Sequence, residues 1–562
     1  MRTGAAATVL VSGLLALSSC GTPQPTTQET TLQGNVFASA SAGGAPVQGA
    51  RVTANLGDSA QSVITGPDGR FSLKLNTAQT AQAFTLTVEP PARSNLYAST
   101  YANVPLEAYR SPYGAANELS IYLGTTRPSA GLPGAALRRG CLTGLLKDPS
   151  GQPVVSNALA VVPVSGAQPV PRPLYDNCAT ELTAIPNFSA GAATLPQPGE
   201  TGLVIYGGSR VVRTDAQGRY LMPVQTTQNL NAVSGAMWAG NFDGSEGDDT
   251  SASVFWSKFQ YVPEVPVFTS GATDTRDITL ENFDPATNPR VTTQPIRYDA
   301  GAIEKPNGAL FDVLTSPAFE PAVTSGAFPL GQYYTSDPAG SHSLRVVKLE
   351  QGNRAQNVSV ETSLYRYADD GETVTGTSSF SAWRDGNNLG GTLTADFIGI
   401  PAPQTPGQKS TGASRTPTLS WNSVARAKVY AVGVYRLTQA GATPVWVGYT
   451  PDTSIQVPLT LEANADYVWQ VSTDDNYEML DYIGKDPLNA EAARWQNVGT
   501  LARRRGVDSA LNTWRGEVAR GVFQATGKVP QDLVEPGAAS QRLQETGYRS
   551  SSSQEFTFKT GN

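Results

Sequence analysis

The sequence predicts an all-β protein built from tandem β-sandwich modules, and three observations support this prediction. The chain of 562 residues is too long for one hydrophobic core. It contains 55 Gly and 40 Pro and only 15% charged residues, which favours turns over long amphipathic helices. Apolar and polar residues alternate in short runs bounded by Gly and Pro, which is typical of strands that bury one face.

The charge balance argues against a nucleic-acid partner. The chain carries 40 basic and 47 acidic residues, a formal net charge of −7. No large positive field is therefore available to attract a phosphate backbone.

The N-terminus predicts export. Arg2 precedes an apolar run over residues 5–17, and residues 1–19 have the pattern of a secretory signal peptide that is too short for a permanent membrane span. Leu17-Ser18-Ser19-Cys20 followed by Gly21 resembles the lipobox of bacterial lipoproteins. The resemblance implies that Cys20 receives lipid and anchors the protein to a membrane of the cell envelope. An ordinary cleaved signal with a chance cysteine is the alternative.

Residues 20–31 are Thr, Gln and Pro with little to bury, so we expect a solvated tether, with the folded part beginning at Leu32. The remaining cysteines, Cys141 and Cys178, form an even pair in a chain predicted to be exported, which predicts a disulfide. Two unrelated buried thiols are the alternative. No cysteine or histidine spacing favours zinc.

An internal repeat divides the first half of the chain. The turn "GPDGRFSL" at residues 66–73 is matched by "DAQGRYLM" at residues 215–222. Two modules are expected, at 32–124 and 140–282. The second carries an insertion near 165–205, and Cys178 within it would be pinned to the first strand by the disulfide.

Both segments resemble the carboxypeptidase regulatory-like domain, a transthyretin-like β-sandwich. The matching residues are Gly34 with "APVQGARV" and "TGPDGRFSL", and Gly144 with "SGQPVVSNALAVV" and "RTDAQGRYLM". The resemblance implies accessory or spacer modules that carry no catalytic residues.

Two further β-rich segments follow. Residues 291–400 alternate without resembling any family, and we expect another sandwich there. Residues 403–562 resemble an Ig-like fibronectin type III domain, with Trp421 and Tyr467 in its core. The segment near 486–528 is rich in Ala, Leu, Glu and Arg, which predicts a helical insertion before the last strand.

No catalytic constellation is evident. His342 is the single histidine of the chain and lies in "DPAGSHSLRV", which indicates a loop residue or a strand edge rather than a general base. No G-x-S-x-G nucleophile elbow accompanies it. A pair of glycosidase carboxylates cannot be recognised from sequence separation, so an unrecognised glycosidase-type activity is the exception that stays open.

Acidic and glycine-rich loops offer two candidate sites. Asp243, Glu246, Asp248 and Asp249 could surround Ca²⁺, although a solvated hairpin tip is the preferred interpretation because the spacing is not that of an EF-hand. The acids and tyrosines of residues 472–482 could form a binding rim at one end of the last sandwich. We expect no metal site and no cofactor.

Aromatic and basic residues give a further alternative. Arg503, Arg504 and Arg505 could contact an anionic polymer or lipid, although a solvated helix end is the commoner reason for such a run. Six tryptophans could form sugar-stacking platforms if exposed, although packing is their commoner role: Trp238, Trp256, Trp383, Trp446, Trp495 and Trp514.

The sequence therefore predicts a non-catalytic lipoprotein of the cell envelope that displays a scaffolding or binding module from a membrane. Envelope proteins or polysaccharide are its expected partners. The alternative is an accessory surface protein for carbohydrate binding or processing.

Overall fold

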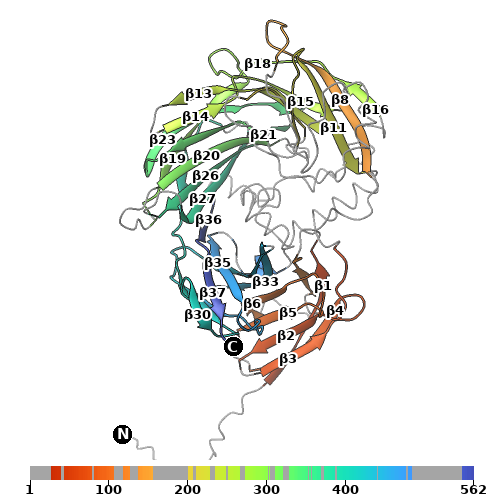
Figure 1. Cartoon of the computed structure of the whole chain (residues 1–562), viewed down its shortest axis with the longest axis vertical. Coiled ribbons are helices and arrows are strands. Elements are labelled where there is room, and N and C mark those ends of the chain that lie inside the picture. The colour runs from red at the N-terminus through yellow and green to blue at the C-terminus, as the bar shows by residue number, and fades with distance from the viewer. Residues whose placement is uncertain are drawn as a thin grey trace, which may run out of the picture.

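The computed structural model describes residues 27–155, 200–483 and 547–562, apart from short gaps within these ranges. The described part is almost entirely β-strand, with one short helix, α2 (Met479–Tyr482), so the predicted all-β class of tandem sandwiches is confirmed (Figure 1). The predicted signal peptide, Cys20, Cys178 and the helical insertion near 486–528 lie outside the described residues. Within that part of the chain, no helix has the length and apolar character needed to cross a bilayer.

The first sandwich packs the sheet β4-β1-β7 against the sheet β3-β2-β5-β6. Its strands are β1 (Thr27–Ala38), β2 (Arg51–Leu56), β3 (Ser59–Ile64), β4 (Arg70–Ala78), β5 (Ala83–Glu89), β6 (Ala98–Pro105) and β7 (Glu118–Leu123).

The predicted tether is shorter than expected. β1 begins at Thr27 rather than at Leu32, and residues 27–31 pair in antiparallel register with the end of β4, from Thr27 opposite Ala78 onward. The backbone hydrogen bonds of this ladder order a segment whose polar side chains gave no sign of burial.

The second sandwich repeats the plan of the first. Its outer sheet, β11-β8-β16, places the first strand between an antiparallel and a parallel neighbour, as in β4-β1-β7, and β17 also pairs with β8. The strands of this sheet are β8 (Leu137–Lys147), β11 (Arg219–Thr227), β16 (Ala272–Thr275) and β17 (Ile278–Thr279). The inner sheet is β10-β9-β12-β15-β18, with strands β9 (Glu200–Tyr206), β10 (Arg210–Arg213), β12 (Gly235–Phe242), β15 (Lys258–Val265) and β18 (Glu281–Asn282).

The two repeats share a turn in atomic detail. Gly69 and Gly218 both have φ of 74°, a conformation that favours glycine. The carbonyl of Gly69 accepts from the Val36 amide at 2.9 Å, and the carbonyl of Gly218 accepts from the Leu146 amide at 2.8 Å. The Gly-Arg-aromatic sequence that the two repeats share therefore occupies the same turn, against the equivalent first strand, in both modules.

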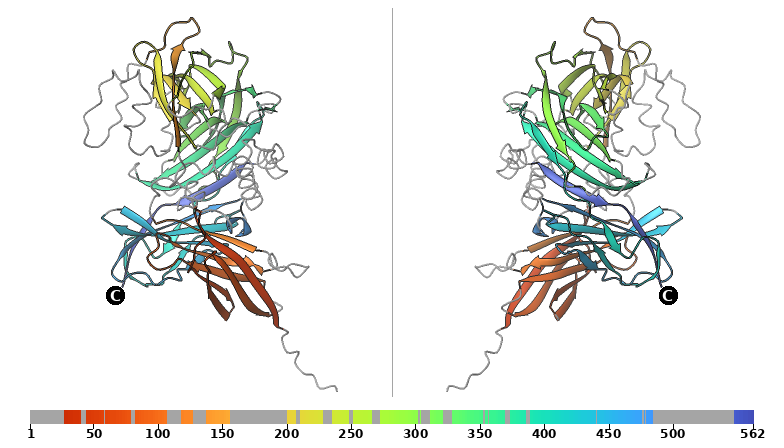
Figure 2. Two further views of the ribbon diagram at one scale, coloured as in Figure 1. Left: turned by 90° about the vertical axis from the view of Figure 1, so that its right-hand side faces the viewer. Right: turned by 90° about the vertical axis from the view of Figure 1, so that its left-hand side faces the viewer.

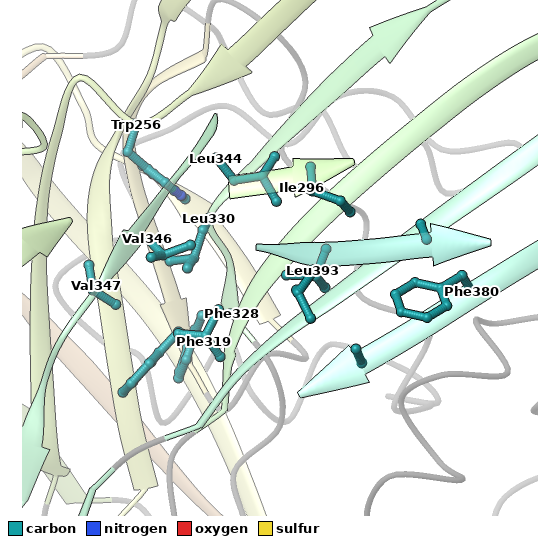
Figure 3. Close-up of a cluster of buried hydrophobic side chains, with 14 of the residues drawn as sticks. Trp256, Ile296, Phe319, Phe328, Leu330, Leu344, Val346, Val347, Phe380 and Leu393 are labelled. Atoms are coloured by element: carbon teal, nitrogen blue, oxygen red, sulfur yellow. The ribbon is translucent and has the colours of Figure 1, made fainter. Parts of the chain in front are cut away.

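The third sandwich packs the sheet β23-β19-β28 against β22-β20-β26-β27. Figure 3 shows part of its core, where Phe319, Phe328, Leu330 and Val346 gather. Its main strands are β19 (Val291–Asp299), β20 (Phe311–Glu320), β21 (Phe328–Pro329), β22 (Gly331–Thr335), β23 (Ala339–Val347), β26 (Asn357–Tyr367), β27 (Val374–Asp385) and β28 (Leu393–Asp396). A small ladder is formed by β24 (Glu350–Gln351) and β25 (Arg354–Ala355).

The fourth sandwich packs β29-β31-β34 against β30-β37-β35-β32-β33. Trp421 and Tyr467 lie in its core, as predicted. Its strands are β29 (Pro403–Thr405), β30 (Ser410–Ala413), β31 (Thr418–Trp421), β32 (Val429–Thr438), β33 (Gly441–Thr450), β34 (Ser454–Gln456), β35 (Asp466–Asp474) and β37 (Phe556–Thr560).

The inner sheet of the second sandwich buries side chains on both faces. Along β12, Met237 and Ala239 enter the core of their own sandwich, whereas Trp238 and Phe242 enter the core of the third sandwich. Trp238 is fully buried there and stacks on Phe259 at a centroid distance of 5.0 Å. Successive side chains of a strand point to opposite faces of its sheet, so this one sheet contributes to the cores of two modules.

The fourth sandwich joins the first in the same way. On β32, Val432 lies in the core of the fourth sandwich and Ala431 lies in the core of the first. β6 extends the sheet by pairing in parallel with β33, with Trp446 opposite Ala98. The first and last modules of the chain therefore share a sheet and a core.

A single strand joins the third and fourth sandwiches. β36 (Tyr548–Ser553) pairs with β27 on one side and with β35 on the other. Arg549 belongs to this strand, and its guanidinium lies between the carboxylates of Asp396 and Asp475, 3.3 Å from the latter. All four modules are thus linked by strand pairing or by shared cores (Figure 1).

We predict that Tyr101 of β6 and Tyr449 of β33, which stack at 5.2 Å, are energetically coupled across the two modules. In a double-mutant cycle of alanine substitutions, urea unfolding should give a coupling of about 1 kcal/mol, because an aromatic pair contributes beyond its buried area. Phe259 lies in the core between the second and third sandwiches. The effects of Tyr101→Ala and Phe259→Ala on the free energy of unfolding should therefore add. Additivity for the Tyr101 and Tyr449 pair would contradict a shared core.

Candidate binding cleft

A cleft of about 250 Å³ opens at the border of the second and third sandwiches. One wall is β23, with His342 and Arg345, and the floor is β22, with Tyr333. The other wall is the hairpin of β13 (Gly244–Gly247) and β14 (Ser251–Phe255), which leaves the second sandwich and pairs with β22 of the third. The cleft thus depends on the joining of the two modules.

His342 lies on β23 with its ring against the floor of the cleft. The imidazole stacks on the Tyr333 ring at a centroid distance of 3.5 Å and lies 5.8 Å from the Tyr298 ring. Both ring nitrogens are buried, and no hydrogen-bond partner is present for either among the described residues. Burial lowers the pKa of His342 to about 4, so the imidazole is neutral at pH 7.

Arg345 closes one end of the cleft. Its guanidinium lies 4.0 Å from the centre of the Phe255 ring, forms an ion pair with Glu246 of β13, and donates to the Phe283 carbonyl at 3.3 Å. The two opposite charges compensate each other. The cleft therefore offers a neutral polar environment of imidazole, phenol and serine hydroxyls, beside apolar ring surface.

The acidic segment predicted as a possible calcium loop forms a hairpin, which was the preferred interpretation. Glu246 is paired with Arg345, and Asp243 accepts a hydrogen bond from the Ser257 hydroxyl. Asp248 and Asp249 lie outside the described residues. Across the part of the chain that the structure describes, no cluster of three or more His, Cys, Asp or Glu side chains could hold a metal ion.

The described tryptophans are packing residues rather than sugar platforms. Trp238, Trp256 and Trp446 are fully buried, and Trp421 and Trp469 are buried in the core of the fourth sandwich. Trp446 donates to the Thr100 hydroxyl at 2.9 Å across the module border. The side chain of Trp383, and Trp495 and Trp514 altogether, lie outside the described residues.

The segment at residues 472–482 does not form the predicted binding rim. Tyr477 and Tyr482 are buried in the core shared by the first and fourth sandwiches. The buried Asp474 carboxylate accepts from the Tyr477 amide at 2.7 Å and from the Tyr482 hydroxyl. Burial raises the pKa of Tyr482 well above its usual value. These acids and tyrosines therefore pack and hydrogen-bond at the contact between the first and fourth sandwiches.

The remaining candidate residues are only partly described. Cys141 lies on β8, opposite Pro223 of β11, but its predicted partner Cys178 lies outside the described residues, so the disulfide stays a prediction. Arg503, Arg504 and Arg505 also lie outside them.

Comparisons with known proteins do not assign a family. No protein-family model matches the chain, and no curated protein matches it. Among solved structures, the Bacillus anthracis TIE protein is 9% identical over 66% of this chain and 50% of that chain, with a TM-score of 0.12. The chicken CNTN1 FN1–FN3 domains are 12% identical over 42% of this chain and 93% of that chain, with a TM-score of 0.12.

A third match is a Ca²⁺-stabilized adhesin that helps an Antarctic bacterium bind ice. It is 11% identical over 81% of this chain and 96% of that chain, with a TM-score of 0.10. TM-scores this low add nothing to the fold argument. The carboxypeptidase regulatory-like and fibronectin type III-like resemblances stay predictions from the sequence.

Sequence reasoning placed His342 in a loop or at a strand edge, and the structure places it on the edge strand β23. It did not find Tyr333, Arg345 or Phe255 as neighbours of this histidine. Their relation to the β13–β14 hairpin depends on pairing across a module border, and no local pattern indicates that pairing.

We predict that His342→Phe changes the pH dependence of stability. The folded-state pKa of about 4 lies below the ordinary 6.5, so the unfolded chain binds the proton more tightly. As pH falls from 6.5 to 4, the wild type should lose stability relative to the variant by up to about 3 kcal/mol, at about 1.4 kcal/mol for each pH unit. At pH 7 the variant should be equal or more stable, because no buried nitrogen is left unpaired. Urea unfolding at pH 7 and pH 4.5 measures this difference, and parallel pH profiles would contradict it.

Proposed function

We propose that this protein is a non-catalytic lipoprotein of the cell envelope that displays a binding cleft from a membrane on a rigid body. The observation that carries the proposal is the linkage of all four sandwiches by shared sheets and cores. Modules joined in this way hold a fixed geometry, whereas flexible linkers would leave their relative positions free.

The short segment between the proposed anchor and the first strand supports display at a defined height. Six residues lie between Cys20 and Thr27, where β1 begins, so seven Cα-to-Cα steps join the two. A fully extended chain spans at most about 3.6 Å per residue, so the start of β1 would lie within about 25 Å of the lipid. The first sandwich would then stand close to the membrane surface.

The position of the cleft fits this arrangement. The first sandwich occupies one end of the molecule, and the strands β8 to β18 occupy the opposite end (Figures 1 and 2). The β13–β14 hairpin, which forms one wall of the cleft, belongs to that far half. Anchoring at Cys20 would thus direct the cleft away from the membrane, where it could meet a partner.

A carbohydrate-binding accessory was the second prediction, and it depended on exposed tryptophans. Trp238, Trp256 and Trp446 are unavailable for stacking because they are fully buried. We therefore favour display of a binding surface and treat saccharide binding as an outcome of the experiments described below.

We predict that cells fed a palmitate analogue label the full-length protein and that Cys20→Ala abolishes the label. The lipid attaches to the Cys20 thiol, so removing this sulfur removes the site of attachment. Cys141→Ala is the matched control and should keep the label and the membrane fraction. Label retained in Cys20→Ala, or recovery of the wild type in the soluble fraction, would contradict the proposed anchor.

A further inference from the structure

β23 is an edge strand without the usual protection. It ends the sheet β23-β19-β28, and among the described strands only β19 pairs with it. It is nine residues long, its register is uninterrupted, and its sequence, AGSHSLRVV, contains neither Lys nor Pro. Its one charged residue, Arg345, is paired with Glu246 of β13. Proteins normally blunt such edges with short strands, bulges, Pro or charge, because an open ladder accepts other strands.

The main-chain groups of alternate residues point toward the open edge. At the two ends of the β19–β23 ladder, the Lys348 amide donates to the Arg290 carbonyl and the Ala300 amide donates to the Pro338 carbonyl. Hydrogen-bonded pairs recur at every second residue, so the even-numbered residues of β23 bond to β19. In an antiparallel ladder, the odd-numbered residues then direct their N–H and C=O groups outward. Ser341 and Ser343 are of this kind, and both side chains are exposed.

The opposite sheet continues beneath the empty position next to β23. β23 packs over β20 and β22, and beyond β22 the sheet extends by β14 and β13. On these strands Ser253 lies opposite Tyr333, and Glu246 lies opposite Ser253, so all three face the side on which Tyr333 stacks on His342. We call the surface formed by β22, β14 and β13 the shelf. The cleft is the space between this shelf and a strand that would continue the β23 sheet.

We propose that β23 accepts an extended segment of a partner protein as an added strand, and that this strand inserts a small neutral polar side chain into the cleft beside His342. This inference rests on the binding role proposed above and names the class of partner. Main-chain bonds to Ser341 and Ser343 supply affinity, as in other cases of β-strand addition.

The cleft supplies the specificity. The residue directly opposite His342 on an added strand has its Cβ atom about 5 Å from that of His342 and points to the same face. There it meets an imidazole with one donor and one acceptor, and the Ser253 hydroxyl oxygen, which can accept a hydrogen bond while it donates to the Glu246 carbonyl at 3.3 Å. A Ser, Thr, Asn or Gln side chain satisfies these groups. A charged side chain finds no free counter-charge among the described residues that line the cleft, because Arg345 and Glu246 are paired.

A second copy of this chain is a poorer occupant than a single strand. Pairing of two β23 edges about a twofold axis would bring the β13–β14 hairpin of each copy into the space beneath the other copy's strand. Each hairpin already occupies that space in its own subunit. A lone extended segment has no such conflict.

The test uses the purified full chain, a phage-displayed library of random linear peptides, and the variant Ser343→Pro. Proline removes the outward N–H of residue 343 without removing a bond to β19, whose facing residue, Pro295, has no N–H to donate. Ser343→Ala, which keeps the N–H, is the matched control. Peptides enriched on the wild type should bind Ser343→Ala equally and Ser343→Pro more than tenfold more weakly, as measured by fluorescence anisotropy.

A second variant keeps the test decisive if Ser343→Pro unfolds. Ser253→Trp fills the cleft from the opposite sheet and should also weaken the enriched peptides more than tenfold, with thermal unfolding as the check on folding. The same peptides should lose affinity when the residue opposite His342 is changed to Asp or Lys.

Four results would overturn the inference. The first is failure to enrich any peptide, and the second is equal binding of the enriched peptides to the wild type and to both variants. The third is retention of polysaccharide that Ser253→Trp abolishes and Ser343→Pro does not. The fourth is a wild-type dimer in sedimentation that Ser343→Pro dissociates. Lipid labelling at Cys20 tests the display proposal separately, so failure of peptide binding leaves the anchoring result intact.

Discussion

Sheets that bury side chains on both faces hold this molecule together. In an ordinary sandwich each sheet has one dry and one wet face, and neighbouring modules meet through small polar contacts. Here β12 sends Met237 into one core and Trp238 into another, and β32 divides its side chains in the same way between the first and fourth sandwiches. Neither sheet could keep both faces buried if the modules separated, so module association belongs to the fold itself.

This constraint also creates the cleft. The β13–β14 hairpin leaves the second sandwich and extends the sheet of the third, past the end of the shorter facing sheet. The mismatch in width leaves β23 unpaired on one side among the described strands, and within that part of the chain the ring nitrogens of His342 are buried without a hydrogen-bond partner. A site of this kind needs no catalytic residue, because its chemistry consists of main-chain hydrogen bonds and one shaped polar space.

The sequence was informative where structure is local. The Gly-Arg-aromatic turns and the alternating runs predicted the strands of the repeats, and Gly69 and Gly218 have the positive φ that such turns require. It misled where polar composition concealed pairing, as in residues 27–31 of β1. It favoured packing over exposure for the tryptophans on general grounds, and the nearly continuous apolar run around Trp238 is the pattern of a strand buried on both faces.

Contacts between modules could not be predicted because they join residues that are tens to hundreds of positions apart. β6 meets β33, and β36 lies between β27 and β35, without any local pattern that specifies the partner. The acids and tyrosines near Asp474 are an example, since their burial depends on the first sandwich being present. Single-chain periodicity identifies which face of a strand is buried but not what covers it.

Native-state hydrogen exchange resolved to single residues tests the central claim most directly. If the first and fourth sandwiches form one cooperative unit, amides of β6 and β33 should exchange with the same opening free energy and the same denaturant dependence. Amides of β6 that open at much lower free energy, while those of β33 stay protected, would show that the first sandwich unfolds alone and would contradict the shared core.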